Sequence, residues 1–363
     1  MSVTETAIKA ALQTVMDPLT GQALVSASAL KSLRISGADV AVDIALPYPA
    51  QSQWPALRAL VQAAVQGVPG VAAVDVSFQL LVQSHAVQRG VQLLPGVKNI
   101  VAVASGKGGV GKSTTAANLA LALTAEGAKV GLLDADIYGP SQPMMMGLSG
   151  HPESLDGKTM QPMVNHGVQV MSIGFLVNPE DAMIWRGPMV TQALEQLLRQ
   201  TLWSDLDYLI VDMPPGTGDI ALTLSQRVPL TGAVIVTTPQ DIALIDARKG
   251  IRMFEKVGVP ILGLVENMAV HVCSQCGHAE HIFGQDGGRR MAAEHGMDYL
   301  GALPLAMSIR VQADGGVPTV VAEPQGELAE QYRNVARQVA VTIAAKAKDF
   351  SAKFPTITIS KGT

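Results

Sequence analysis

The stretch that decides the fold of this chain reads Gly106-Lys107-Gly108-Gly109-Val110-Gly111-Lys112-Ser113-Thr114. It fits the phosphate-loop pattern G-x-x-x-x-G-K-[ST], in which backbone N–H groups of a glycine-rich turn close around phosphate. Apolar residues 100–104 precede it and predict a buried strand, whereas residues 113–126 predict a helix. In this setting we expect the nine residues to bind a nucleotide, with Lys112 neutralising the β- and γ-phosphates and the Ser113 hydroxyl binding Mg²⁺.

From residue 99 onward, predicted strands alternate with predicted helices. Short apolar runs predict strands at 100–104, 130–134, 168–173, 208–211, 233–237, 261–266 and 299–303. Segments with helical spacing fall at 113–126, 188–201, 220–226, 242–257, 289–295 and 327–347. This alternation predicts an α/β fold, a P-loop NTPase whose mainly parallel sheet is flanked by helices on both faces. Ligand is then expected beyond the carboxyl ends of the strands.

A small α+β domain is predicted ahead of the nucleotide domain. Helices and strands are expected there at 4–16, 40–46, 55–66 and 70–78. Glycine and proline breakers then predict a linker. We therefore expect a small domain at 1–83, a linker at 84–98 and an ATPase domain at 99–363.

Composition and charge argue against several classes of protein. The net charge is −4 without a basic tract, so we expect no nucleic-acid partner. No apolar run approaches the length of a membrane span, and residues 1–16 lack the pattern of a signal peptide. We therefore expect no membrane partner and a cytoplasmic location. In that reducing compartment, two cysteines are more typical of ligands or redox groups than of a disulfide.

Carboxylates end two further predicted strands of the ATPase domain. Asp134 and Asp136 follow one of them, and Asp212 follows another. We expect Asp136 to position the water that attacks the γ-phosphate, Asp134 to support it, and Asp212 to hold the water shell of Mg²⁺. The next loop contains Gly216, whose N–H is expected to contact the γ-phosphate and to respond to hydrolysis.

A second lysine, Lys107, follows the first glycine of the loop, although cradling phosphate does not require it. It resembles the signature lysine of deviant phosphate-loop ATPases, a class that includes division-site, plasmid-partition and nitrogenase-iron-protein ATPases. The resemblance implies that two subunits face each other and that Lys107 of each reaches the phosphates of the other. A cation delivered only on dimerisation would couple assembly to hydrolysis, as an arginine finger does.

The chain has only two cysteines, Cys273 and Cys276, which form a C-x-x-C pair. Three interpretations fit this pair. A 4Fe–4S cluster takes four thiolates, so two chains related by a two-fold axis would complete the set. Zinc would take both cysteines with His278 and His281, at a spacing far shorter than in zinc fingers. The third interpretation is a dithiol redox switch, or no function.

Taken together, the motifs resemble those of one family. GKGGVGKST, DADIYGPS, YLIVDMPPGTGD, TTPQDIALIDARKG, ENM and C-x-x-C occur in one order. They are similar to the Mrp/ApbC family of iron–sulfur cluster carrier ATPases from residue 95 to residue 320. Residues 1–83 are similar to the small domain often fused in front of these ATPases, which also occurs alone in iron–sulfur assembly proteins. That domain often carries a cysteine, whereas the corresponding residues 46–53 contain none.

The resemblance implies a homodimer that binds ATP, hydrolyses it slowly, and holds a labile 4Fe–4S cluster on Cys273 and Cys276 of both subunits. It implies transfer to apo iron–sulfur client proteins, alongside other cluster assembly proteins, and recognition of adenine by Asn267. Two other functions stay open. One is a Min/Par-type positioning ATPase, although residues 350–363 show no basic amphipathic helix. The other is a zinc-binding, nucleotide-dependent regulator.

Overall fold

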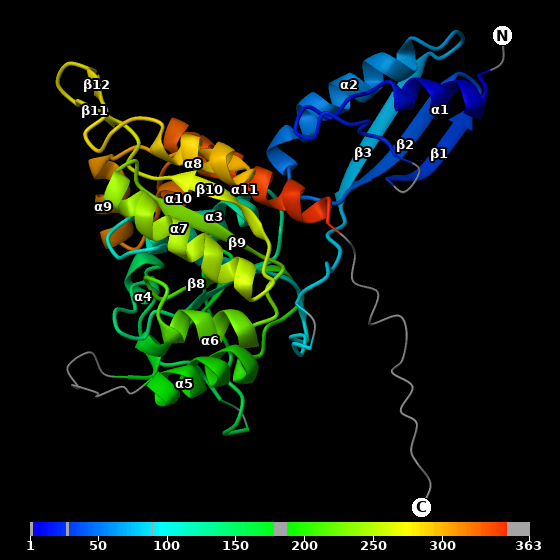
Figure 1. The fold of residues 1–363 in the computed structure, drawn as a ribbon. Coiled ribbons are helices and arrows are strands. Elements are labelled where there is room, and N and C mark those ends of the chain that lie inside the picture. Colours follow the sequence, from blue (N-terminus) through cyan, green and yellow to red (C-terminus); the bar gives the residue numbers. More distant parts are fainter. Residues whose placement is uncertain (1–2, 27–28, 89, 155, 178–186, 347–363) are drawn as a thin grey trace, which may run out of the picture.

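The structure is a computed structural model that describes residues 3–26, 29–88, 90–154, 156–177 and 187–346. Within these ranges the chain forms a small domain and a larger one (Figure 1). Residues 350–363, which bear on the membrane-helix question, lie outside them. Among the described helices, none has the length and apolar character needed to cross a membrane.

The small domain packs two helices against one face of a three-stranded sheet (Figure 1). Strand β1 is antiparallel to β2, and β3 is parallel to β2. The elements are α1 (Glu5–Gln13), β1 (Leu30–Ser36), β2 (Asp39–Leu46), the 3-10 turn η1 (Gln51–Gln53), α2 (Trp54–Gln66) and β3 (Ala73–Leu80). Buried and exposed residues alternate along β3, as expected when one face of a sheet is covered and the other is open.

The larger domain is built on an eight-stranded sheet with the order β13-β10-β9-β4-β8-β5-β7-β6. Every neighbouring pair is parallel except β6 and β7. The strands are β4 (Val97–Ala104), β5 (Val130–Asp134), β6 (Met163–Asn165), β7 (Val168–Ser172), β8 (Leu206–Asp212), β9 (Gly232–Thr237), β10 (Ile261–Glu266) and β13 (Tyr299–Ala302). Strands β8 and β9 are buried at every position, which explains their continuous apolar sequences.

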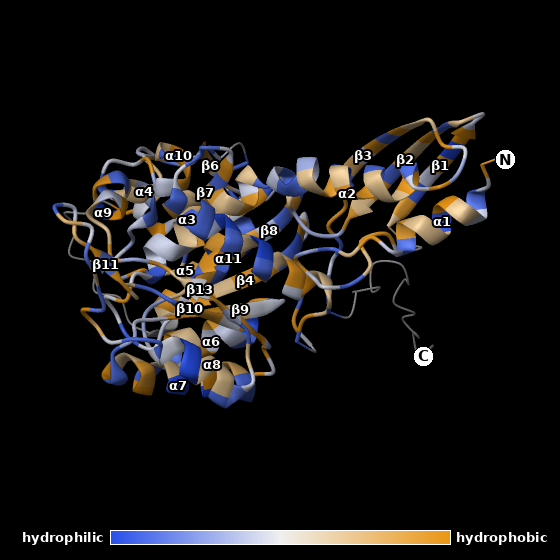
Figure 2. Cartoon of the chain, turned by 90° about the horizontal axis from the view of Figure 1, so that it is seen from above, coloured by the Kyte–Doolittle hydropathy of each residue, from blue (hydrophilic) through white to orange (hydrophobic). Residues whose placement is uncertain are grey.

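Helices cover both faces of this sheet, as Figure 2 shows. Helices α3, α10 and α11 pack together on one face, and α6, α7 and α8 lie on the other. The helices are α3 (Lys112–Ala125), α4 (Gln142–Met145), α5 (Gly187–Gln200), α6 (Asp219–Arg227), α7 (Asp241–Lys256), α8 (Gly287–His295), α9 (Met307–Asp314), α10 (Thr319–Ala322) and α11 (Glu327–Ala344), with a 3-10 turn η2 (Ile173–Phe175). Strands β11 (His271–Val272) and β12 (Ala279–Glu280) form a separate ribbon. The predicted α/β fold with a mainly parallel sheet is confirmed.

Every strand and helix predicted from the sequence is present, with its ends within three residues of the prediction. The elements not predicted are short or lie at an edge: β1, β6, the ribbon, α4, α9 and α10. Strand β6 joins β7 through His166 and Gly167, both at positive φ, 50° and 77°. These two residues form the two-residue loop of a tight hairpin, in which positive φ at both positions matches the twist of the strands.

The two domains meet at the carboxyl end of α3. Glu126 is fully buried there and accepts hydrogen bonds from the Ser52 N–H at 2.9 Å and the Ser52 hydroxyl at 2.6 Å. Arg337 of α11 donates from Nη1 to the same carboxylate at 2.5 Å. Tyr48 and Ala50 are buried in the core of the larger domain. Residues 48–52, which the sequence predicts within the small domain, therefore form the junction.

Candidate functional site

The phosphate loop joins β4 to α3, and two of its glycines lie where a side chain would not fit. A Cβ on Gly106 would lie 2.1 Å from the backbone of Asp246 in α7. A Cβ on Gly111 would lie 2.1 Å from Asn267 Nδ2. Gly111 also has a φ of 83°, which favours glycine, and it caps α3. The phosphate loop is thus packed between α7 and the segment after β10. The amino end of α3 faces the space that the loop encloses.

Two adjoining cavities lie at this carboxyl edge of the sheet. The first, of about 240 Å³, is lined by the loop together with Asp136, Ser141, Met145 and Pro215. The second, of about 280 Å³, is lined mainly by apolar residues, among them Met268, Pro304, Leu305, Ile309 and Tyr332, and its polar lining residues include Asn267, Arg310 and Asp314. Gly111, Thr114 and Met145 line both cavities. A ligand with a phosphate end and a less polar end matches this pair of cavities.

The Lys112 ammonium lies between the two groups that the sequence predicts for Mg²⁺. Its Nζ is 2.5 Å from Asp212 Oδ1 and 3.1 Å from Ser113 Oγ. Lys112 and Asp212 are buried, with exposed fractions of 6% and 0%, so water screens their attraction little. Asp212 Oδ1 and Ser113 Oγ both contact the positively charged Lys112 ammonium. Mg²⁺ also prefers oxygen ligands of this kind. The residues present therefore fit a nucleotide-bound magnesium ion.

The two aspartates after β5 occupy different places. Asp134 is fully buried and accepts hydrogen bonds from the N–H groups of Asp136 and Gln142 and from the Ser172 hydroxyl. Burial, followed by the charge of Asp212, raises the pKa of Asp134 to about 7. Asp136 lines the first cavity, and burial also raises its pKa. Asp136 can therefore reach a bound phosphate, whereas Asp134 holds the backbone of the loop that presents it.

Lys107 lines the first cavity and is half-buried. Its backbone carbonyl accepts a hydrogen bond from the Ser105 hydroxyl at 2.9 Å. Within the described residues, its ammonium has no hydrogen-bond or ion-pair partner. This charge is therefore available to a ligand or to a second subunit.

The N–H of Gly216, which the sequence analysis expects to contact the γ-phosphate, points elsewhere in the structure. Its N–H donates to the carbonyl of Ser105 at 3.0 Å, so in this conformation it does not face the phosphate space. Contact with a γ-phosphate would require this hydrogen bond to break. A sensing role for Gly216 stays a prediction, and it now includes a movement of the loop after β8.

Asn267 and Met268 directly follow β10 and line the second cavity. Asn267 donates from Nδ2 to the carbonyl of Val110 at 2.8 Å, which joins this cavity to the phosphate loop. Met268 has a φ of 56°, an uncommon value for a residue with a side chain. Such backbone strain often marks a binding site, which agrees with the predicted contact between Asn267 and a base.

Cys273 and Cys276 lie in the turn of the ribbon formed by β11 and β12, which projects from the larger domain (Figure 1). The turn is closed by hydrogen bonds from Cys273 N–H to His278 O and from Gly277 N–H to Cys273 O, both 2.9 Å. Backbone hydrogen bonds, first from Gln275 and then from Cys276, lower the pKa of the Cys273 thiol. Cys276 is exposed and Cys273 partly so. The ribbon therefore presents two accessible sulfurs, one of them favoured as thiolate.

The histidines near this turn do not complete a metal site within one chain. His281 donates from Nδ1 to the carbonyl of Ala269 at 2.7 Å, at the stem of the ribbon. Among the described residues, no group of three or more His, Cys, Asp or Glu side chains could hold a metal ion. The four ligands of the zinc interpretation are thus not brought together, because His281 is directed to the stem rather than to the sulfurs.

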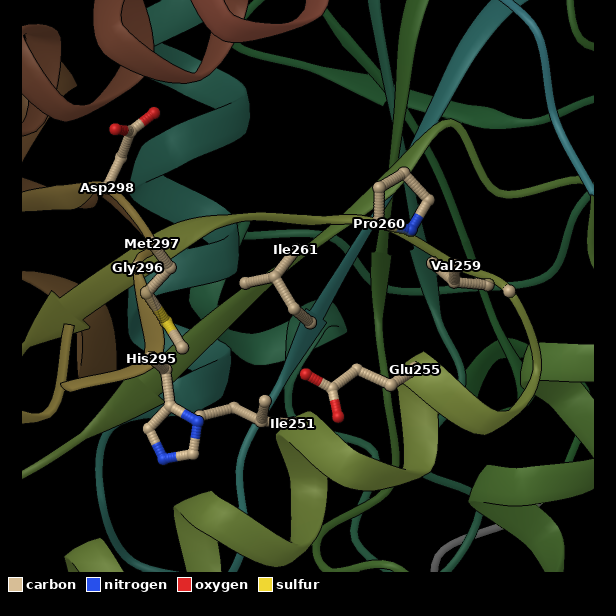
Figure 3. Close-up of a pocket in the computed structure, with 10 residues that line it drawn as sticks. Ile251, Glu255, Val259, Pro260, Ile261, His295, Gly296, Met297 and Asp298 are labelled. Atoms are coloured by element: carbon tan, nitrogen blue, oxygen red, sulfur yellow. The ribbon is translucent and has the colours of Figure 1, made fainter. Parts of the chain in front are cut away.

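A larger cavity, of about 470 Å³, lies at the opposite edge of the sheet (Figure 3). It is bounded by the end of α7, the chain entering β10 and the chain entering β13. Its ionisable side chains are Glu255, His295 and Asp298. Since α/β sheets bind ligands beyond the carboxyl ends of their strands, this amino-edge cavity is not the nucleotide site.

One residue at the site had no sequence signal. Gln142, the first residue of α4, is fully buried and donates from Nε2 to Asp212 Oδ2 at 2.9 Å and to the Ser113 carbonyl at 3.0 Å. These contacts arise only because β5 and β8 lie side by side. A local sequence pattern does not encode them.

Two family models match the chain. One, described as the NUBPL iron-transfer P-loop NTPase, matches residues 96–340, and the other, described as an iron–sulfur cluster assembly protein, matches residues 5–77. The iron–sulfur cluster carrier protein of Pseudomonas fragi is 58% identical over 279 residues, covering 76% of this chain and 97% of the relative. That of Escherichia coli strain K12 is 53% identical over 303 residues, covering 83% and 82%. The iron–sulfur cluster transfer protein NUBPL of Mus musculus is 55% identical over 248 residues, covering 68% and 78%.

Solved structures give the same fold. A nucleotide-binding protein from Archaeoglobus fulgidus, in complex with ADP, has a TM-score of 0.56 at 36% identity, covering 64% of this chain and 91% of its own. The cell division ATPase MinD of Pyrococcus furiosus has a TM-score of 0.51 at 23% identity, covering 66% and 98%, and at that identity supports the fold alone.

Proposed function

The chain belongs to the family of NUBPL-type iron-transfer P-loop NTPases, and on this premise we propose how it carries an iron–sulfur cluster. In this proposal a homodimer binds ATP and Mg²⁺ at its phosphate loops and holds one 4Fe–4S cluster, as cargo, on Cys273 and Cys276 of both subunits. The dimer passes the cluster to apo iron–sulfur client proteins and works alongside other cluster assembly proteins. Its compartment is the reducing cytoplasm, where thiols stay reduced.

The observation that carries this proposal is the ribbon with its two accessible sulfurs. Two thiolates are half of the set that a 4Fe–4S cluster usually takes. Within the described residues, no further ligands gather around them. A second copy of the same ribbon would complete the set, and the exposed turn leaves the cluster open to transfer.

The residues of the two cavities define the nucleotide chemistry that we propose. ATP would supply its γ-phosphoryl group for transfer to water, with ADP as the leaving group, and Mg²⁺ would offset the charge of the phosphates. Lys112 exchanges its contact with Asp212 for the phosphates, which frees the Ser113 and Asp212 oxygens for the ion and its water shell. Asp136 orients the attacking water, and Lys107 of each subunit reaches the phosphates of the other.

Contacts between the second cavity and the ribbon support a coupling of nucleotide to cargo. Asn267 in the cavity wall and Cys273 in the ribbon belong to one continuous segment. Leu305 also lines this cavity, and its carbonyl accepts a hydrogen bond from His271 Nδ1, in β11, at 3.0 Å. A base that moves either wall would therefore shift the stem of the ribbon.

The test is anaerobic reconstitution with iron and sulfide, followed by iron, sulfide and zinc content per chain and solution mass. We expect about two irons and two sulfides per chain in a dimer. Cys273→Ala should lose the cluster and keep nucleotide binding. Ser274→Ala, a change in the same turn, is the matched control and should keep both. About one zinc per chain without sulfide, or full iron content in Cys273→Ala, would refute the bridged cluster.

A further inference from the structure

Gln142 contacts three parts of the phosphate site at once. Its side-chain Nε2 donates to Asp212 Oδ2 at the end of β8 and to the Ser113 carbonyl in the first turn of α3. Its backbone N–H donates to Asp134 Oδ2 at the end of β5, at 3.1 Å. One residue thus joins the phosphate loop to the carboxyl ends of two adjacent strands.

The chemistry of these neighbours fixes the orientation of the Gln142 amide. Both the Ser113 carbonyl and the Asp212 carboxylate accept hydrogen bonds, so the nitrogen must face them. The amide oxygen, Oε1, is then left buried, and it has no hydrogen-bond partner among the described residues. Burying an unpaired acceptor costs stability. An apolar side chain of similar size would avoid that cost, so packing alone does not account for a glutamine here.

Gln142 Nε2 and Lys112 Nζ bind different oxygens of the Asp212 carboxylate. Lys112 pairs with Asp212 Oδ1, and Gln142 with Oδ2. When Lys112 turns to phosphate, Gln142 is the described donor that stays on this carboxylate. The second bond, to the Ser113 carbonyl, fixes the residue whose hydroxyl is the other predicted oxygen for Mg²⁺.

We propose that Gln142 is a positioning residue that holds Ser113 and Asp212 at a fixed separation and so sets how strongly Mg²⁺ increases nucleotide affinity. This inference rests on the proposed function, since it presumes that the phosphate loop binds a magnesium nucleotide. It assigns Gln142 no contact with the reacting atoms. Its effect is on binding through two other residues.

The experiment titrates a fluorescent ADP analogue into full-length protein, with Mg²⁺ and with excess EDTA, and compares the two affinities. Gln142→Met keeps the size of the side chain and removes the donor. We expect its affinity without Mg²⁺ to stay within about twofold of wild type, and its gain from Mg²⁺ to fall about tenfold, the worth of one hydrogen bond to a charged group. Gln142→Leu is the second variant, should the first fail to fold.

Gln169→Met is the matched control, because it also removes a glutamine with two hydrogen bonds, both to the backbone of Ser204. It should leave the gain from Mg²⁺ unchanged. A gain in Gln142→Met within about twofold of wild type would overturn the positioning role, since one charged hydrogen bond is worth more. A wild-type protein that shows no gain at all would instead refute the proposed nucleotide site, so the two failures are distinguishable.

Discussion

Positive charge at the phosphate site is divided between two lysines that are held in different ways. Lys112 is buried and paired with Asp212. The ammonium of Lys107 has no partner in the part of the chain that the structure describes. A paired lysine must leave its carboxylate to neutralise phosphate, whereas an unpaired one need not. This difference supports a binding role for Lys112 within its own chain and a turnover role for Lys107.

Lys107→Ala should therefore separate binding from hydrolysis. We expect nucleotide affinity to change by less than about threefold and turnover to fall about 10²–10³-fold, the usual cost of losing one group that stabilises the transition state. Lys112→Ala should instead abolish hydrolysis. Unchanged turnover in Lys107→Ala, measured as phosphate release, would count against the role of Lys107.

Mixing the two inactive variants tests whether Lys107 acts across a dimer. In a mixed dimer, the Lys112→Ala subunit keeps Lys107 and can supply it to the intact phosphate loop of the Lys107→Ala subunit. We expect equal mixtures to recover about a quarter of the wild-type rate, since half of randomly formed dimers are mixed and each has one complete site. Failure to recover activity, in mixtures shown to exchange subunits, would refute action in trans.

The pKa of Asp134, raised to about 7 by burial and by the charge of Asp212, predicts a pH dependence of stability. Between its ordinary value of 3.8 and about 7, the folded state keeps a proton that the unfolded state has released. The free energy of unfolding must therefore fall as the pH rises through this window. In Asp134→Asn, we expect this fall to be smaller, by at most about 1.4 kcal/mol per pH unit, in urea unfolding between about pH 5 and pH 7.

Asp156→Asn is the control for this measurement. Asp156 is exposed, and backbone N–H groups, first that of Thr159, lower its pKa. It is ionised in both states across the window, so replacing it should leave the slope unchanged. An equal slope in wild type and Asp134→Asn would mean that Asp134 is ionised in the folded state.

At this scale, the positions of site residues could be predicted where the residues are neighbours in the sequence. A loop of nine residues places Lys107, Lys112 and Ser113 around one cavity because they are adjacent in the chain. The sequence also predicts Asp136 near the phosphate, because the carboxyl ends of neighbouring parallel strands meet at one edge of the sheet. Asp136 does line this cavity. Gln142 and the hydrogen bond that occupies Gly216 were not foreseen, since both depend on distances between separate elements.

Among the elements, the ribbon shows how a short hairpin can present cysteines away from the body of the domain. Its stem is fixed by side chains, because each strand has only two residues. His271 donates to the carbonyl of Leu305, and His281 to that of Ala269. The imidazoles therefore hold the ribbon in place, a role that the spacing of cysteines and histidines did not indicate.

His281→Ala should therefore leave cluster binding unchanged and make the ribbon more mobile. We expect reconstituted iron per chain to stay at the wild-type level, while amide hydrogen exchange of residues 271–281 becomes about tenfold faster, as expected when about one hydrogen bond is lost. His278→Ala, which removes an exposed imidazole of the same turn, is the control and should change neither. Loss of iron in both variants would instead indicate that His278 and His281 bind the metal together with the two cysteines.

At the scale of the whole molecule, the two domains are joined at the end of the helix that begins at the phosphate loop. Glu126, after the last residue of α3, is separated by 74 residues from Ser52 and by 211 from Arg337. Sequence analysis predicted two domains from composition and periodicity, but it did not predict their junction, because a lone glutamate after a helix predicts only a solvated end. The hydrophobic residues at 48 and 50, read as part of the small domain, are instead buried in the larger core.

Substitutions at this junction should show how much each hydrogen bond contributes to stability. Glu126 and Arg337 both belong to the larger domain, whereas Ser52 belongs to the small-domain side of the junction. Glu126→Ala removes the buried carboxylate that pairs with Arg337 and leaves that guanidinium with the partly exposed Glu330, so the free energy of unfolding should fall by about 1.5–3 kcal/mol. Ser52→Ala removes the hydroxyl that donates to Glu126 and accepts from Arg337 Nη1, but it keeps the Glu126–Arg337 pair, so the expected loss is about 1–2 kcal/mol. Gln66→Ala, at the exposed carboxyl end of α2, is the control and should have little effect. Urea unfolding measures all three.

A second readout decides whether Ser52 holds the domains together, because stability alone cannot assign a loss to one interface. In Ser52→Ala, a weakened junction should let the small domain move, which should increase the radius of gyration in X-ray scattering and the rate of proteolysis in residues 84–98. Gln66→Ala should match wild type in both. If Ser52→Ala lowers stability without changing either measure, the hydrogen bonds of Ser52 support only the end of α3. If both measures rise, Ser52 holds the small domain to the carboxyl end of α3, the helix whose amino end follows the phosphate loop.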